Sequence, residues 1–223
     1  MPPWVPEESW SGQDVFIIGG GNSLRESHFD WNLLKPERTI GVNDAYLLGP
    51  EICKVCFFSD ARFWKANEKA LAKFAGLVFT CYPQLYKTKI PWLWTIHREN
   101  QGLWHKSVGF NGNTGATAIN LAFLFGAMRV FLLGFDMKLV AGKPHWHDNL
   151  LTKQSLNPTT YQDFVRRFRF LVRDWKLKFP DRQIINLTKD SGLPAHMIPW
   201  KDPDEFWAER VSSRLVQAGV KNG

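Results

Sequence analysis

Cysteine is scarce in this sequence of 223 residues, and the little present excludes two common uses of it. Cys53, Cys56 and Cys81 form an odd set that is too small for a disulfide framework. The spacing of Cys53 and Cys56 fits half of a zinc site, but no second pair completes it. We therefore expect three ordinary buried thiols.

Long hydrophobic runs are also missing. The longest candidate, residues 118–133, is interrupted by Gly126 and Arg129, and a membrane-spanning helix needs about 18 to 20 apolar residues. The first residues have neither the basic start nor the apolar stretch of a signal peptide. We expect a cytoplasmic protein without a transmembrane segment.

Aromatic and basic residues, by contrast, are plentiful. The sequence has 17 Phe and 11 Trp, is 44% hydrophobic and carries a formal net charge of +7. This composition supports a dense core and excludes an intrinsically disordered chain. The length fits one domain over residues 1–223.

Short apolar runs alternate with helical patterns along the chain. Residues 15–18 end at three glycines, as a buried parallel strand entering a tight turn would. The clearest helix, 161–179, repeats apolar residues every three or four positions. This order predicts an α/β, Rossmann-like fold, with an open, mostly parallel sheet and helices on both faces. The other expected strands are 39–43, 54–60, 77–80, 129–134 and 183–187, and the other expected helices are 61–74, 113–126 and one from residue 200 onward.

Two segments without periodicity are predicted to be irregular active-site loops. Residues 82–110 are rich in aromatics and proline and are typical of a lid. Residues 138–160 contain His145 and His147, either of which could deprotonate an acceptor hydroxyl as a general base. The same pair could bind a metal with Asp136 or Asp148, or serve only as structural or surface histidines.

Two turns of small residues are candidate phosphate sites. In residues 19–23, after the first strand, glycines would let backbone N–H groups approach a phosphate, although a plain tight turn explains them too. Residues 112–115 begin an apolar helix, and the first N–H groups and the dipole of a helix favour an anion. Helix capping alone also explains the residues at these positions. Together the two turns favour a bound nucleotide over two independent caps.

Polar residues also lie at the ends of three of the expected strands, at Asn43-Asp44, Ser59-Asp60 and Asp136. In open α/β sheets such positions border the ligand, where they could hold a base, a ribose or a phosphate, or else cap a helix. The predicted catalytic residues are His147, His145 and Asp136. The predicted nucleotide-binding residues are Gly19, Gly20, Gly21, Asn22, Ser23, Asn43, Asp44, Ser59, Asp60, Asn113, Thr114 and Gly115.

Most of the excess positive charge falls in one part of the chain. Residues 138–182 hold ten basic and four acidic side chains. Arg166, Arg169, Arg173 and Lys176 follow steps of three and four, so they form one stripe opposite the apolar face of the predicted helix. Such a stripe is usually a solvated face, and the alternative is an anionic acceptor, DNA or an acidic glycan, beside the histidine loop.

In order and spacing these motifs resemble the sialyltransferase-like superfamily, namely glycosyltransferase family 42 and related phage and bacterial proteins of the domain of unknown function 115 type. The similar pieces are 18–26, 42–46, 57–60 and 113–115 leading to 133–136, and the His145-Trp146-His147 run is similar to the phage-type members. The resemblance implies that the glycine turn, Asn43, Ser59 and the 113–115 helix start bind the nucleotide of an activated donor. It also implies that a histidine after Asp136 is the acceptor base.

The leading hypothesis is a metal-independent glycosyltransferase that moves a sugar from a CMP- or UDP-linked donor to a hydroxyl group, using a histidine base. One alternative is an ATP-dependent diphosphokinase-like transferase, which would need a divalent metal. Another is a DNA-modifying or DNA-binding protein, which the net positive charge of the chain would favour. A plain binding module and assembly into a homo-oligomer stay open.

Overall fold

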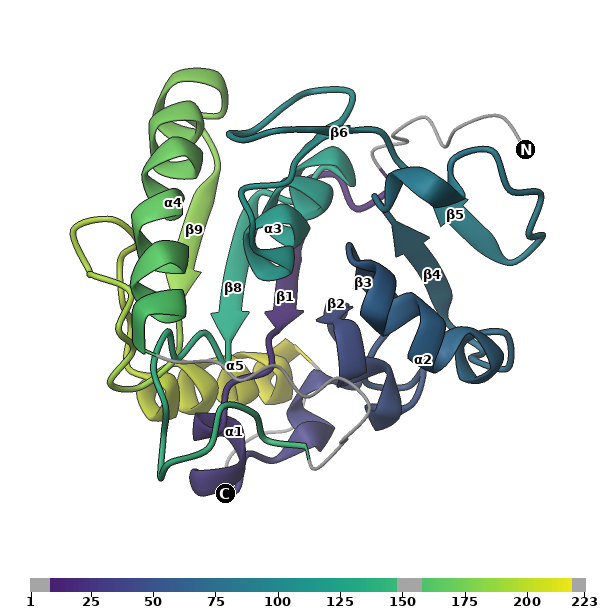
Figure 1. Ribbon diagram of the computed structural model, residues 1–223. Helices are drawn as coiled ribbons and strands as arrows, with labels where there is room; N and C mark the ends of the chain where they lie inside the picture. Colours follow the sequence, from purple (N-terminus) through teal and green to yellow (C-terminus); the bar gives the residue numbers. More distant parts are fainter. Residues whose placement is uncertain (1–8, 148–157, 218–223) are drawn as a thin grey trace.

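The computed structural model describes residues 9–147 and 158–217. A seven-stranded sheet in the order β5-β4-β3-β2-β1-β8-β9 forms its centre, and every strand pair is parallel (Figure 1). The predicted α/β, Rossmann-like fold is confirmed. The strands are β1 (Asp14–Ile18), β2 (Arg38–Val42), β3 (Val55–Phe58), β4 (Leu77–Thr80), β5 (Leu93–Thr95), β8 (Arg129–Leu133) and β9 (Gln183–Asn186).

Two alternating sets of side chains on β1 and β8 explain how the sheet is covered. Ile17 and Leu132 face the helices α3 (Thr114–Leu124) and α4 (Pro158–Lys178), in a core cluster that includes Phe168. Phe16, Phe131 and Leu133 point to the other face, where they pack against Phe206 and Trp207 of α5 (Pro203–Gln217). Because neighbouring residues of a strand face opposite ways, a strand buried on both faces must be apolar throughout.

The chain order places a crevice beside β1. From β1 the chain builds the sheet outward through β2 to β5, passing α2 (Ala61–Leu71), and then returns to add β8 on the other side of β1. In open α/β sheets a ligand binds beyond the carboxyl ends of the strands at such a change of direction. Here that position lies beyond Ile18 and Leu133.

Residues 82–110 are less irregular than the sequence indicated. They contain a 3₁₀ helix (Pro83–Leu85), the edge strand β5, and a separate two-stranded ladder of β6 (Arg98–Glu99) with β7 (Val108–Gly109). Strands of two or three residues are too short to show a period in the sequence, and the pairing of β5 with β4 depends on a distant segment.

Several smaller elements also differ from the expected ones. The predicted irregular segment 138–160 ends early, because α4 begins at Pro158, and proline suits the first position of a helix. The short helix α1 (Ser23–Glu26) and two 3₁₀ helices, Trp31–Leu34 and Asn43–Leu48, had no sequence signal. The three cysteines are buried free thiols, as expected. Within the described ranges, no helix is long and apolar enough to cross a membrane.

Candidate functional site

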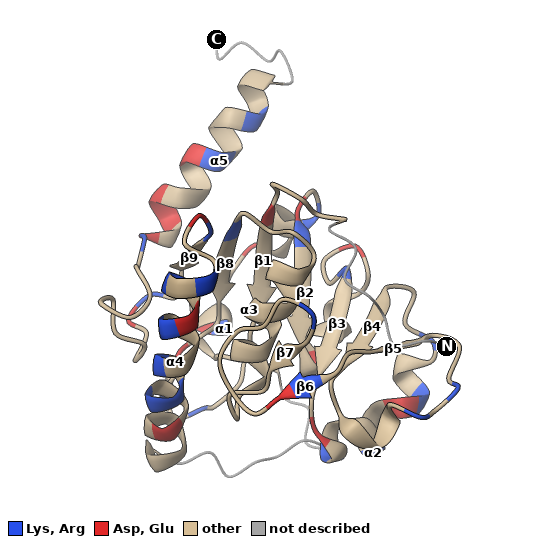
Figure 2. Ribbon diagram, turned by 90° about the horizontal axis from the view of Figure 1, so that it is seen from above, with Lys and Arg blue, Asp and Glu red and all other residues tan. Residues whose placement is uncertain are grey.

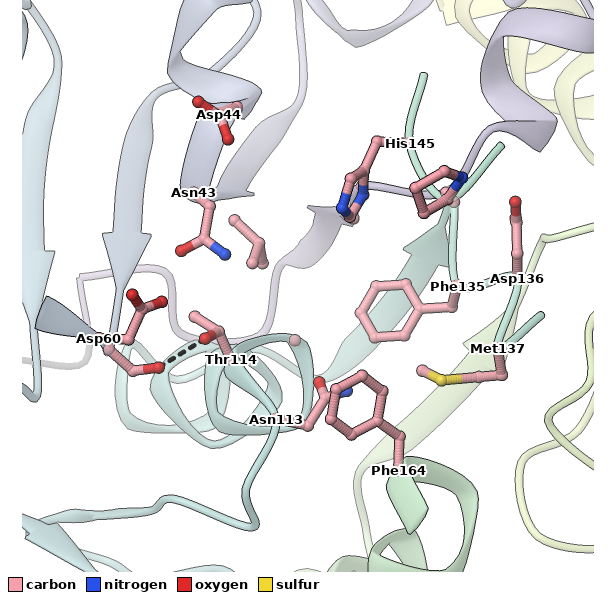
Figure 3. Close-up of a pocket in the computed structure, with 18 of the residues that line it drawn as sticks. Asn43, Asp44, Asp60, Asn113, Thr114, Phe135, Asp136, Met137, His145 and Phe164 are labelled. Atoms are coloured by element: carbon pink, nitrogen blue, oxygen red, sulfur yellow. Dashed lines mark hydrogen bonds between the residues drawn. The ribbon is translucent and has the colours of Figure 1, made fainter. Parts of the chain in front are cut away.

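A pocket of about 410 Å³ lies beyond the carboxyl ends of β1, β2, β3 and β8, between the histidine loop and the first turns of α3 and α4 (Figure 3). Of the fifteen predicted site residues, all but Asn22 and Ser23 line it. The structure therefore brings together residues that are more than 120 positions apart in the sequence. Those at the pocket are Gly19, Gly20, Gly21, Asn43, Asp44, Ser59, Asp60, Asn113, Thr114, Gly115, Asp136, His145 and His147.

The glycine turn is packed against the end of β8. The Gly19 N–H donates to the carbonyl oxygen of Leu133 (2.8 Å), and the Gly21 N–H donates to that of Gly134 (2.9 Å). A Cβ atom on Gly21 would lie 2.5 Å from the Gly134 oxygen and would collide with the Asp136 carboxylate. Two of the three glycine N–H groups thus hold the fold, and close backbone approach explains the glycines.

The Asp136 carboxylate holds this turn in place through two hydrogen bonds with Ser23. One carboxylate oxygen accepts the Ser23 N–H (2.9 Å) and the other accepts the Ser23 hydroxyl (2.5 Å). Burial raises the pKa of Asp136, and the hydrogen bonds from Ser23 oppose that shift. The buried Asn22 donates to the Glu26 carboxylate (3.1 Å) and to the Val140 carbonyl (3.0 Å). Asn22, Ser23 and Asp136 therefore hold the turn and the loop above it in place.

The histidine loop rests directly on the glycine turn. Trp146, between the two histidines, donates its backbone N–H to Gly20 O (3.0 Å) and its indole N–H to Gly19 O (3.0 Å). Its ring also packs near Trp31, with the centroids 5.4 Å apart. Sequence reasoning missed this anchoring role, for which an aromatic residue between two polar ones was the only signal.

The two imidazole rings differ in their surroundings. They stack with centroids 5.1 Å apart and an interplanar angle of 8°. His147 Nε2 lies 3.7 Å from Asp44 Oδ2, and both side chains are almost fully buried. Figure 3 shows His145 directed into the pocket, and its Nδ1 is buried beside Gly20.

Burial lowers the pKa of His145 from 6.5, against opposing contributions from the Gly20 backbone, Asp44 and Asp136. The protonated imidazole is penalised because a charge loses hydration when it is buried. His145 is therefore neutral at neutral pH, which is the form that a proton acceptor needs.

The opposite wall is formed by the ends of β2 and β3 and the start of α3. The Ser59 and Thr114 hydroxyls share a hydrogen bond of 2.5 Å, which ties β3 to α3 (Figure 3). Asn43 adopts a left-handed backbone conformation (φ 52°) that directs its amide into the pocket. Asparagine adopts this conformation more readily than other non-glycine residues.

Asp60 and Asn113 have mainly capping roles. The Asp60 carboxylate accepts the Phe63 N–H at the start of α2 (2.9 Å). The Asn113 side chain accepts the Ala116 N–H at the start of α3 (2.9 Å). Both contacts are standard N-caps, and both leave the residue at the pocket wall.

Twelve of the lining residues were not among the predicted site residues, and three of them add a charge, a hydroxyl group or an aromatic face. Tyr161, expected only as a core position of its helix, lines the pocket, and burial raises its pKa to about 12, with Asp136 adding to the shift. Arg62 is the single lysine or arginine among the described lining residues. Phe164 contributes an aromatic wall from α4 (Figure 3). Helical periodicity alone cannot tell a core position from one that borders a cavity.

The segment expected to be an aromatic lid has little part in the pocket wall. Within the described residues, only Phe110 of 82–110 lines the pocket. The basic stripe is exposed on α4, as Figure 2 shows in blue. Its members do not line the pocket, and Arg166 and Arg173 form ion pairs with Asp163 and Asp174.

A metal centre has no support from side-chain clustering. Among residues 9–147 and 158–217, no group of three or more His, Cys, Asp or Glu side chains could hold a metal ion. Asp148, named as a potential third ligand, lies outside the described residues.

The fold is shared with solved structures of the sialyltransferase CstII. The complex of the Campylobacter jejuni enzyme with cytidine-5'-monophosphate has a TM-score of 0.52 and 14% identity, over 85% of each chain. The complex of CST-II with a trisaccharide acceptor and CMP has a TM-score of 0.52 and 16% identity, over 84% of this chain and 86% of that chain. This likeness shows a sialyltransferase-like fold. No protein-family model matches the sequence, and no curated protein matches it significantly.

Proposed function

We propose that this chain is a glycosyltransferase that moves a sugar from a CMP-linked donor to an acceptor hydroxyl. The observation that carries the proposal is that a neutral imidazole, His145, faces the start of α3 and the polar ends of β2 and β3 within one pocket. The structures that share the fold were solved with CMP or a CMP-linked analogue, which favours CMP over UDP. Membership of family 42 or of its phage-type relatives stays a prediction.

The nucleotide and its phosphate would bind along the α3 side of the pocket. The first N–H groups of a helix have no partner within that helix, and the helix dipole favours an anion there. Thr114 and Ser59 add hydroxyl groups, Asn43 adds an amide and Arg62 adds a positive charge. These groups would stabilise the negative charge that develops on the leaving nucleotide.

His145 would act as the base. Its Nδ1 is buried beside Gly20, so Nε2 would take the proton from the acceptor hydroxyl. The acceptor oxygen would form a bond to the anomeric carbon as the bond from that carbon to the phosphate oxygen breaks. The nucleoside monophosphate would leave with the electron pair. Asp44, through His147, would keep the stacked ring in position.

The test compares nucleotides by thermal shift on the full chain. CMP should raise the melting temperature more than UMP, GMP or ATP, because only CMP fits the proposed donor. Thr114→Val removes the hydroxyl at the proposed phosphate position and should weaken CMP binding about ten-fold. Thr88→Val is the matched control, because it loses a similar hydroxyl contact, to Leu85, away from the pocket.

Stabilisation by none of the nucleotides would contradict the proposal. A response to ATP alone would favour the diphosphate-transfer alternative instead. Turnover of CMP-linked sugars in the presence of an acceptor mixture, followed as CMP release, completes the test.

A further inference from the structure

A second pocket opens from the first along the start of α4. It has a volume of about 370 Å³. Phe110, Gly112, Thr160 and Phe164 line both pockets, so the two form one continuous groove. The second pocket adds Arg167, Asp163 and the hydroxyl-bearing Thr159 to this shared wall, and neither the sequence motifs nor the proposed donor site uses these side chains.

Arg167 lines the second pocket and lies against Gly112, which both pockets share. A Cβ atom on Gly112 would lie 2.7 Å from Arg167 Nη1, so the guanidinium group lies against the Gly112 backbone. Gly112 has φ +65° and directly precedes Asn113, the cap of α3. The side chain is exposed, but its charge lies at the wall of the second pocket, next to the pocket in which the donor would bind, whereas the basic stripe lines neither pocket.

The charge and the aromatic wall of this second pocket suit one kind of ligand. The Asp163 carboxylate forms an ion pair with Arg166. The guanidinium group of Arg167 therefore makes the charge of the second pocket positive. The Phe110 ring is stacked against Arg98, whose guanidinium carbon lies 4.3 Å from the ring centroid. Aromatic faces such as those of Phe110 and Phe164 pack against the C–H faces of a sugar ring, and threonine hydroxyls can hydrogen-bond to its hydroxyl groups.

An arginine fork pairs bidentately with a carboxylate, which a neutral sugar lacks. Duplex DNA would instead need a series of cations along its backbone and could not enter a pocket of this size.

We propose that this second pocket is the acceptor subsite and that it selects a carboxylated sugar through Arg167. The inference rests on the proposed glycosyltransferase function. With the acceptor ring between Phe110 and Phe164, its carboxylate would meet the guanidinium and its reacting hydroxyl would face the main pocket.

The test uses the labelled full chain, saturated with CMP, on an array of neutral and carboxylated oligosaccharides. Carboxylated sugars should bind at least ten-fold more tightly than their neutral counterparts. Arg167→Gln should remove that preference. Arg169→Gln is the matched control on the same helix, because its side chain stacks on Phe170 and lines neither pocket, and it should keep the preference.

Three outcomes would overturn the proposal: equal binding of neutral and acidic sugars, no binding of any sugar, or identical behaviour of the two variants. Preferential, salt-dependent binding of DNA oligonucleotides would overturn it in favour of a nucleic-acid partner. Thermal shift with CMP distinguishes a failure of the acceptor proposal from a failure of the proposed function. If CMP binds and the array result fails, only the acceptor proposal falls, and if CMP does not bind, the proposed function falls as well.

Discussion

The glycine turn and the start of α3 have similar sequences and different roles. Both are runs of small residues, and both were predicted to hold phosphate. In the glycine turn, the Gly19 N–H is bonded to the last residue of β8 and the Gly21 N–H to Gly134, which follows it, while Ser23 is bonded to Asp136. At the start of α3, Asn113 caps the helix while the Thr114 hydroxyl stays at the pocket wall, bonded to Ser59.

The difference shows that a glycine-rich turn after a strand can serve the fold rather than the ligand. Its carbonyl groups, at Gly19 and Gly20, accept the hydrogen bonds by which Trp146 holds the histidine loop. The turn thus supports the loop that carries the proposed base, and the start of α3 is the proposed anion site. Variants can therefore separate stability from ligand binding.

The largest expected effect is on kcat, and it comes from replacing the proposed base, His145. His145→Gln should lower kcat by about 10²- to 10⁴-fold, the usual contribution of a general base. His147→Gln should cost less, because that ring faces Asp44 and acts through His145. The kcat values of the two variants are compared with that of the native chain by turnover of CMP-linked sugar, at equal concentrations of folded protein. A larger loss in His147→Gln would reverse the two roles.

Next in size is the stability difference between the two turns. Gly21→Ala should lower the free energy of unfolding by about 1 to 3 kcal/mol or more, because its Cβ meets the rigid Gly134 backbone. In Gly115→Ala the new Cβ would meet the Phe135 ring (2.9 Å) and the capping oxygen of Asn113 (3.1 Å), which are side-chain rather than backbone atoms. This variant should therefore lose less stability than Gly21→Ala, while its CMP affinity falls. Urea unfolding and thermal shift measure the two quantities, and equal destabilisation would show that the turns do not differ.

A third comparison sets Asp136 against Asp60. Asp136→Asn keeps an oxygen for the Ser23 N–H but replaces two charge-assisted bonds by neutral ones and makes the Ser23 hydroxyl the acceptor, so it should cost about 1 to 2 kcal/mol of unfolding free energy. Asp60→Asn is the control, because asparagine is as good an N-cap as aspartate. Chemical denaturation distinguishes them, and a neutral Asp136→Asn would argue against the fixing role of the carboxylate.

The smallest effect is the pH dependence of stability. His145 has a pKa lowered from 6.5, so below that pH the unfolded chain binds a proton that the folded chain still excludes. The free energy of unfolding should therefore fall as pH drops below 6.5. The raised pKa of Asp136 acts in the opposite direction, because the stability that its protonated form contributes is lost as pH rises above 3.8. Between pH 5 and 7, melting temperatures of His145→Gln should vary less with pH than those of the native chain.

The sequence predicted the strands and long helices well because their signals are local. Buried parallel strands such as Val55–Phe58 are continuous apolar runs, and α4 repeats its apolar positions at helical spacing. β5 escaped prediction because three residues carry no period. The strand-end rule also located the pocket, since Asn43, Ser59 and Asp136 all reach it.

The sequence by itself determined the fold class and the approximate set of residues at the site. Only the tertiary structure decided what each of them does. Whether a glycine N–H faces a ligand or a neighbouring strand depends on β8, more than 100 positions away in the chain. The same holds for Arg167, which the sequence leaves among ten basic residues and the fold places against Gly112. Local patterns record burial and periodicity, whereas the roles of polar groups depend on partners that only long-range packing brings within hydrogen-bond distance.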